Sequence, residues 1–264
     1  MVPPHAPPPT PFPFYVVLDV SASMRRLDIL PEGASQTPFD TVERYLPELV
    51  AVLQNRGSLP EAFRDIDILD IFAAQEVAHI GFITFADDAR VLVPLTSVKD
   101  TRLRVPPLPR DGTSTNYAAV FYLLAQTVKA DLDAFDKAFL PGWHYHPVVF
   151  FITDGNAEVN GDQQRREGSA GWGVYYDWFL KNVGDGSREP VLLPLGLGQV
   201  ERSTIAALAH LTDGFIAGPG ANAAYLLEAI IPSICRSISL SSGNGKFQFE
   251  LPGGLGMERV ASQR

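Results

Sequence analysis

The segment Phe14–Met24, with the sequence FYVVLDVSASM, decides the fold of this chain. Its first five residues are large, apolar and rich in aromatic and β-branched side chains, which predicts a buried strand. Asp19, Ser21 and Ser23 follow at the carboxyl end of that strand, where open α/β sheets bind their ligands. Three oxygen donors within five residues suit a hard cation such as Mg²⁺. They also suit a loop that caps the next helix, and this segment alone does not separate the two interpretations.

The composition predicts a globular protein with a full hydrophobic core. The chain has 264 residues, of which 46% are hydrophobic and 19% charged. Its formal charge of −9 argues against a nucleic-acid partner, because such partners require a clustered basic surface. Cys235 is the only cysteine, so no internal disulfide forms and a cytoplasmic location is expected. No apolar run approaches the roughly 20 residues that span a bilayer, so no membrane partner is expected.

The chain divides into three parts. Residues 1–13 form a proline-rich lead-in, which lacks the basic start and apolar core of a signal peptide. Residues 14–239 form the folded domain, and residues 240–264 form a tail that is expected to stay loose or to add a strand. The tail contains one stretch of alternating apolar residues, 246–251.

Strand patterns alternate with helix patterns along the folded domain. After the first strand, further strands are expected at 76–85, 89–95, 147–153, 191–197 and 214–217. Helices are expected at 39–54, 62–72, 116–135, 175–183, 203–210 and 223–237. This alternation predicts a doubly wound, Rossmann-like α/β fold whose mainly parallel sheet is covered on both faces. The short turn at Asp87 and Asp88 predicts a hairpin, and hence one antiparallel strand at the sheet edge.

Two other loops carry polar residues at the boundaries of predicted elements. Thr113 stands just before the helix expected at 116–135, and Asp154 follows the strand expected at 147–153. The carboxyl ends of neighbouring strands meet at one crevice in a doubly wound sheet, so these loops are expected to meet the first one. Together they offer two carboxylates and three hydroxyls, which leaves a coordination position on Mg²⁺ for an incoming ligand.

Three motifs in this order are DVSAS at residues 19–23, a Gly-Thr pair at 112–113 before a helix, and ITDG at 152–155. Together they resemble the metal-ion-dependent adhesion site of the von Willebrand factor A domain, and the resemblance covers residues 14–239. It implies that family's α/β fold and a bound Mg²⁺, with Mn²⁺ or Ca²⁺ as alternatives. The metal ligands that it implies are Asp19, Ser21, Ser23, Thr113 and Asp154.

Shorter segments are similar to the bacterial TerY-like branch of that family. They are ITF at residues 83–85, VPLT at 93–96, GTS at 112–114 and LGLG at 195–198. This branch is associated with tellurium and stress resistance and is often encoded beside a serine/threonine kinase and a PP2C-type phosphatase. The resemblance implies a cytoplasmic, non-enzymatic adaptor whose metal contacts an acidic side chain of a protein partner. An accessory subunit of an AAA+ ATPase machine is the alternative.

The sequence departs from the family pattern at several positions. Ala22 replaces a frequent glycine, and Asp111 stands where the family usually has glycine, so its charge would either tighten cation binding or repel an acidic partner. The loops 25–38 and 156–173 are long and are expected to flank the metal and to select the partner. Arg165 and Arg166 in the second loop are candidates for contacting an acidic or phosphorylated partner, although solvated surface is the more ordinary role for such residues.

A metal-dependent phosphohydrolase is the alternative from a different functional class. Enzymes that form an aspartyl-phosphate also begin with an acid at a strand end, but they typically carry a second Asp two residues later, where this chain has Ser21. Neither the Gly-Lys-Ser/Thr signature of a P-loop nor a Gly-x-Ser-x-Gly motif occurs. The sequence therefore predicts a binding protein without catalytic activity.

Overall fold

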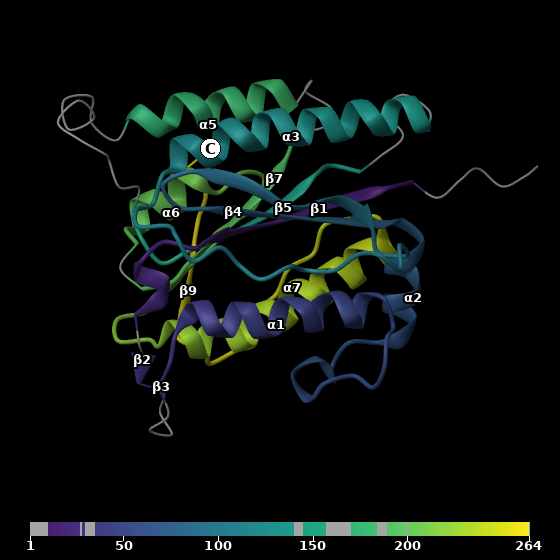
Figure 1. Ribbon diagram of the computed structural model, residues 1–264, viewed down its shortest axis with the longest axis horizontal. Coiled ribbons are helices and arrows are strands. Elements are labelled where there is room, and N and C mark those ends of the chain that lie inside the picture. The colour runs from purple at the N-terminus through teal and green to yellow at the C-terminus, as the bar shows by residue number, and fades with distance from the viewer. Residues whose placement is uncertain are drawn as a thin grey trace, which may run out of the picture.

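The computed structural model describes residues 10–26, 28–29, 35–139, 145–156, 170–183, 189–198 and 200–263. A seven-stranded sheet lies between two layers of helices (Figure 1). Its strands are β1 (Phe12–Asp19), β4 (Ala78–Phe85), β5 (Ala89–Ser97), β6 (Val148–Thr153), β7 (Val191–Gly196), β8 (Gly214–Ala217) and β9 (Met257–Val260). The α-helices are α1 (Pro38–Leu53), α2 (Ile68–Val77), α3 (Tyr117–Ala138), α5 (Ala170–Val183), α6 (Arg202–Leu208) and α7 (Ala223–Asn244).

The strand order is β5-β4-β1-β6-β7-β8-β9, with parallel pairing from β4 through β8. The strand β5 pairs antiparallel with β4 at one edge, which confirms the expected hairpin. At the other edge β9 pairs antiparallel with β8, so the C-terminal tail does add a strand. The predicted doubly wound α/β fold is therefore confirmed, and an antiparallel pair closes each edge of the sheet.

The first strand lies at the centre of the sheet because both of its faces are apolar. All eight residues of β1 are buried. Phe14, Val16 and Leu18 pack into the hydrophobic core on one face, whereas Tyr15 and Val17 pack into the core on the other. Buried parallel strands carry apolar residues continuously rather than alternately, and the segment that opens this chain has that pattern.

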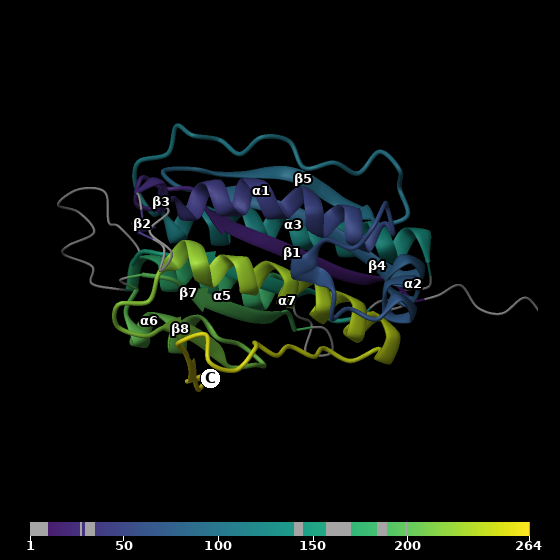
Figure 2. The ribbon, with the colours of Figure 1, turned by 90° about the horizontal axis from the view of Figure 1, so that it is seen from below.

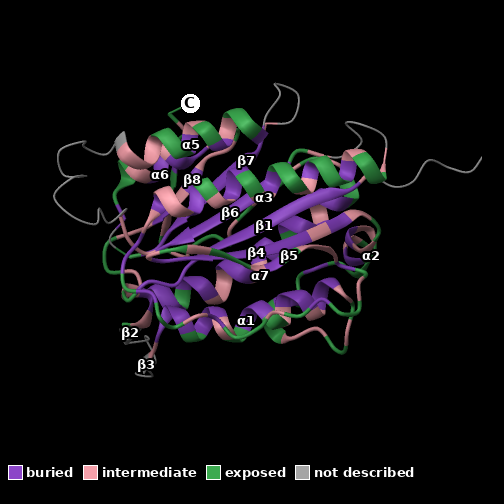
Figure 3. Ribbon diagram, turned by 45° about the horizontal axis from the view of Figure 1, so that its top comes forward, coloured by how far each residue is buried: buried purple, intermediate pink, exposed green. Residues whose placement is uncertain are grey.

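Helices cover both faces of the sheet. Figures 1 and 2 show α1, α2 and α7 on one face, with α3 and α5 packed together on the other. Figure 3 shows the strands buried along most of their length, while α3 and α5 carry exposed residues on their outer sides. The sheet is therefore shielded from solvent, and its strand ends remain as the places where polar side chains gather.

Several boundaries differ from the expected ones. The segment 62–72 is not one helix: a 3-10 turn, η2, spans Glu61–Phe63, and α2 begins later because Asp67 caps it by accepting from the Leu69 N–H. Within the predicted loop 25–38, two short strands pair: β2 (Asp28–Ile29) and β3 (Ser35–Gln36). The spacing of apolar residues alone does not reveal helix caps or two-residue strand pairs of this kind.

The C-terminal segment completes the core on the α1 and α7 side. The last helix, α7, passes the predicted domain boundary at 239 and ends at Asn244, with Gly245 in the left-handed conformation. The alternating stretch 246–251 forms no strand. Its apolar residues Phe247 and Phe249 pack against the core, with ring centroids 6.1 and 5.9 Å from that of Phe150.

One described helix, α7, is long and apolar enough to cross a membrane by length and composition. Most of its apolar window, 67%, is buried inside the fold. The helix packs against α1 and α2 and contributes Ile230, Ile231 and Ile234 to the core beneath the sheet. This packing accounts for its apolar composition.

Candidate metal centre

The candidate site lies where β1 and β6 end side by side. The two strands are parallel neighbours, and Leu18 pairs with Ile152 in their register. Asp19 and Thr153 are the next residues of the two strands, and Asp154 follows in the loop after β6. The register of the sheet therefore brings these residues together from positions that are far apart in sequence, as the sequence predicts.

Asp19 is buried and held by two hydrogen bonds. Its side chain is 1% exposed. The backbone N–H of Ser21 donates to Asp19 Oδ1 at 2.9 Å, and Thr153 Oγ1 donates to Asp19 Oδ2 at 2.8 Å. These contacts fix the carboxylate at the end of β1.

A chain of hydroxyl contacts connects the first loop to Asp154. Ser23 Oγ donates to Asp154 Oδ1 at 2.7 Å, and Ser21 Oγ lies 2.9 Å from Ser23 Oγ. Because the Ser23 hydroxyl has one hydrogen and gives it to the carboxylate, Ser21 is the donor in the contact between the two serines. Four of the five predicted ligands, Asp19, Ser21, Ser23 and Asp154, are thus brought together in one polar network.

The electrostatics of this network favour a cation. Burial, together with the nearby charge of Asp154, raises the pKa of Asp19 to about 7, although hydrogen bonds from Ser21 and Thr153 act in the opposite direction. Two carboxylates that destabilise each other's ionised form are stabilised by a positive charge between them. The arrangement therefore disfavours two bare carboxylates and suits a bound divalent cation.

Thr113 is placed differently from the other predicted ligands. Its side chain is exposed, and its hydroxyl donates to Asp87 Oδ1 at 2.8 Å. The Thr113 N–H and the Ser114 hydroxyl also donate to the Asp87 carboxylate, at 2.6 and 2.7 Å. In the described part of the chain, no hydrogen bond joins Thr113 to the other four predicted ligands. Asp87 holds this loop because one carboxylate satisfies three donors, which lowers its pKa well below the ordinary value.

Two residues that the sequence analysis did not select also line the site. A Cβ built on Gly155 would lie 3.3 Å from Thr115 Oγ1 and 4.0 Å from Ser23 Oγ, so the buried Thr115 hydroxyl faces the loop that carries Asp154. The Tyr117 hydroxyl donates to the Gly155 carbonyl at 2.8 Å. Thr115 is the third hydroxyl of a Thr-Ser-Thr run, a signal visible in the sequence. Nothing in the sequence indicates the contact of Tyr117.

Gly112 and Arg25 bind the Thr113 loop to the first loop. A Cβ on Gly112 would lie 2.2 Å from the Cβ of Ala86, so only glycine permits this close approach to the end of β4. Arg25 donates from Nη1 to the Val20 carbonyl at 2.8 Å and from Nη2 to the Gly112 carbonyl. Both loops are therefore fixed relative to each other by contacts that do not involve the predicted ligands.

The unusual Asp111 is paired within the chain. Arg90 Nη2 lies 3.0 Å from Asp111 Oδ2, and this contact lowers the pKa of Asp111 below its ordinary value. Its carboxylate is thus paired with Arg90 on β5 in an exposed ion pair. Arg165 and Arg166 lie outside the described residues, and so does most of the loop 156–173.

The donor set matches a hard cation. Within the described residues, no three His, Cys, Asp or Glu side chains form a group that could hold a metal ion. A metal at this site would therefore depend on two carboxylates supplemented by hydroxyl oxygens, which is oxygen-only chemistry of the kind that Mg²⁺ takes. Asp19, Ser21, Ser23 and Asp154 fit such an ion.

Comparison with known proteins agrees with this fold. A sequence model of the von Willebrand factor type A domain matches residues 14–156. A search of curated protein sequences finds no match.

Solved structures resemble the chain at low sequence identity. The proximal thread matrix protein 1 from the mussel byssus, with a zinc-occupied MIDAS motif, has a TM-score of 0.51 and 12% identity, over 88% of this chain and 49% of that chain. A second crystal form of the same protein gives a TM-score of 0.50, with the same identity and coverage. The ArnB paralogue VWA2 from Sulfolobus acidocaldarius has a TM-score of 0.43 and 14% identity, over 84% of this chain and 44% of that chain. This chain spans about half the length of these proteins. The likeness to the mussel protein shows the fold alone.

Proposed function

Because this chain belongs to the von Willebrand factor type A domain family, we propose that it is a non-enzymatic protein-binding module that holds a divalent cation for a partner to contact. Domains of this family are commonly protein-interaction modules. The proposal concerns the cation, its ligands and the partner, and it rests on the polar network at the ends of β1 and β6.

One observation carries the proposal: the Ser21–Ser23–Asp154 hydrogen-bonded chain beside the buried Asp19 carboxylate. These side chains present oxygens to one place, and the ionised form of Asp19 is disfavoured there without a positive charge. Mg²⁺ is the proposed cation, with Mn²⁺ or Ca²⁺ as alternatives, and Thr113 remains a proposed fifth ligand. When bound, such a cation supplies an electron-poor coordination position for a carboxylate oxygen of a partner.

A catalytic role has less support. An aspartyl-phosphate mechanism needs a nucleophilic carboxylate that is accessible to substrate. Asp19 is 1% exposed, and both of its oxygens accept hydrogen bonds from within the chain. The test is direct: the purified protein with Mg²⁺ is expected not to hydrolyse p-nitrophenyl phosphate. Turnover that disappears in Asp19→Ala would replace the binding proposal with a phosphohydrolase.

The binding proposal itself is tested with a carboxylate probe. A peptide with one central Glu is titrated into the full chain with Mn²⁺, whose paramagnetism broadens the NMR signals of groups bound beside it. Selective broadening of the Glu side chain is expected in the wild type and not in Asp19→Ala. A peptide with Gln at that position is the matched control. Equal broadening of both peptides would refute capture of a carboxylate by the metal.

We propose further that the chain acts in the cytoplasm in a bacterial TerY-like stress-response or phospho-signalling system. The support is the set of short segments quoted above, among them VPLT at 93–96 in β5 and LGLG at 195–198 at the end of β7. The partners would be a serine/threonine kinase and a PP2C-type phosphatase, and an AAA+ ATPase is the alternative. The neighbouring genes test this: a kinase and phosphatase pair supports it, and an ATPase gene favours the alternative.

A further inference from the structure

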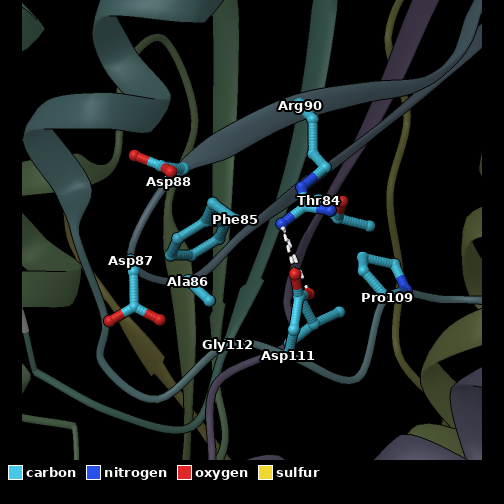
Figure 4. A pocket seen from close by; sticks show the side chains of 10 residues that line it. Thr84, Phe85, Ala86, Asp87, Asp88, Arg90, Pro109, Asp111 and Gly112 are labelled. Carbon is cyan, nitrogen blue, oxygen red and sulfur yellow. Dashed lines mark hydrogen bonds and ion pairs between the residues drawn. The ribbon is translucent and has the colours of Figure 1, made fainter.

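A small pocket lies beside the candidate metal centre, between the end of β4 and the loop that leads to Thr113. Its volume is about 110 Å³. The residues that matter for the argument are Thr84, Ala86, Arg90, Asp111 and Gly112 (Figure 4). The pocket is separate from the network of Asp19, because that side chain does not line it.

The pocket contains a buried hydroxyl without a partner. Thr84 is 0% exposed, and within the described residues its Oγ1 accepts and donates no hydrogen bond. Arg90 is the residue paired with Thr84 in the β4–β5 register, but its guanidinium donates to Asp111 instead. A buried hydroxyl that loses its bonds to water and gains none in return is unfavourable. A ligand in the pocket that carries a hydrogen-bond donor would therefore supply the partner that Thr84 Oγ1 lacks.

Acidic side chains outnumber basic ones among the residues that line the pocket, and Asp111 is the acid that faces the same side as Arg90. Asp87, Asp88 and Asp111 line it together with Arg90, and the Arg25 guanidinium binds the carbonyls of Val20 and Gly112 at its edge. Figure 4 shows the Asp111 carboxylate facing Arg90, while the carboxylates of Asp87 and Asp88 lie on the other side of Phe85. These acids do not converge as metal ligands, in agreement with the lack of a three-residue metal group among the described residues. A ligand that carries its own N–H donors fits better than a bare ion.

We propose that this pocket binds a primary ammonium group through Thr84 Oγ1 and the Asp111 carboxylate, and that in the cell this group is a lysine side chain of the protein partner. The second part rests on the proposed function. A cavity of about 110 Å³ admits the end of a lysine side chain but no nucleotide. Arg90 and Asp111 have 54% and 68% exposed side chains, and such ion pairs contribute little stability, so Asp111 remains available to a second cation.

The position of the pocket links it to the metal. Val20 and Gly112 line the pocket, and their sequence neighbours Asp19 and Thr113 are predicted ligands. A partner that places an acidic side chain on the cation would therefore have the pocket beside that contact. The recognition element inferred for the partner is an acidic residue with a lysine next to it on the same surface.

The experiment uses the full chain with ¹³C-labelled alanine methyl groups. The Ala86 methyl reports on the pocket in every variant, because Ala86 lines it and is not changed. The probe is n-butylammonium, and tetramethylammonium is the control, since it has the same charge but no N–H donor. A saturable shift of the Ala86 signal is expected with n-butylammonium and not with the control.

Variants assign the contacts. Thr84→Val and Asp111→Asn are each expected to weaken n-butylammonium about tenfold, which corresponds to one charge-assisted hydrogen bond. Thr84→Ser keeps the hydroxyl and should retain the wild-type affinity. Asp133→Asn, which removes an exposed acid on α3, is the control for general charge effects and should change nothing.

Three results would overturn the proposal: no saturable shift with n-butylammonium, equal shifts with tetramethylammonium, or undiminished affinity in Thr84→Val. A shift of the Ala86 signal by Mg²⁺ alone in Asp19→Ala would show a metal pocket and would overturn it as well. Failure of the proposed function is distinguishable, because Mg²⁺ binding is measured by calorimetry without the probe. Asp19→Ala is expected to lose Mg²⁺ binding and to keep the response to n-butylammonium.

Discussion

Replacing Gly112 by alanine should destabilise the fold in a calculable way. The new Cβ would lie 2.2 Å from the Cβ of Ala86 and 3.2 Å from the Val20 carbonyl oxygen. Since carbon atoms in contact lie about 3.5–4.0 Å apart, the loop must move by about 1.5 Å. The Ala86 methyl is fixed to the backbone and cannot rotate away. Overpacking of this kind costs about 1–3 kcal/mol, which lowers the Tm by about 2–12 °C for a domain of this size.

Thermal and urea unfolding of the full chain measure this effect. Gly173→Ala is the matched control, because nothing lies within 4 Å of its new Cβ and the residue sits in α5, where alanine is favoured over glycine. The double variant Gly112→Ala/Ala86→Gly removes the clashing methyl and should recover part of the lost stability. A Gly112→Ala protein as stable as the wild type, or a double variant with no recovery, would refute the reasoning.

Three further predictions concern polar groups. Thr153→Val removes the donor to the buried Asp19 carboxylate and should cost about 1.5–3 kcal/mol in urea unfolding; an unchanged midpoint would contradict the assigned bond. Burial raises the pKa of Asp131, which accepts from Tyr15, so the free energy of unfolding falls as pH rises through the interval between the unfolded and the folded pKa. Asp131→Asn keeps an acceptor and should flatten that decline in urea midpoints measured at several pH values; an unchanged slope would exclude this group as the cause. Thr113→Ala should lower Mg²⁺ affinity in calorimetry, and an unchanged affinity would remove Thr113 from the ligand set.

The position of the central strand and the proximity of the four residues Asp19, Ser21, Ser23 and Asp154 were predictable because each depends on strong local patterns. The uninterrupted apolar run of β1 has one stable environment, the middle of a covered parallel sheet. Once β1 and β6 are neighbours, the register alone brings Asp19 next to Thr153 and Asp154. No other feature of the sequence is needed to explain why these side chains lie close together.

The placement of Thr113 was not predictable from its own neighbourhood. Its orientation depends on Asp87, 26 positions away, which collects three donors from the Thr113 loop. The sequence identifies Asp87 as a turn residue but contains no pattern that pairs it with that loop. The orientation of a loop side chain depends on such hydrogen bonds to residues far away in the sequence. In a strand, by contrast, the pleat of the backbone sets the side to which each side chain points.

The C-terminal tail shows the same limit. The alternation of Phe247, Phe249 and Leu251 is typical of a strand, yet these residues pack on the core without joining the sheet. The added strand is β9, where Val260 alone of the four residues is buried. The alternation of apolar residues therefore predicted which side chains are buried. It did not predict which segment pairs with β8, because that depends on the free edge of the sheet beside β8.

Isothermal titration calorimetry of Mg²⁺ into metal-free protein tests the central claim most directly, with the wild type and Asp19→Ala compared at the same pH. We expect one Mg²⁺ per chain in the wild type and no measurable binding in Asp19→Ala, whose folded state is checked by circular dichroism. Undiminished Mg²⁺ affinity in the folded variant would contradict the assignment of the metal to the network at the ends of β1 and β6.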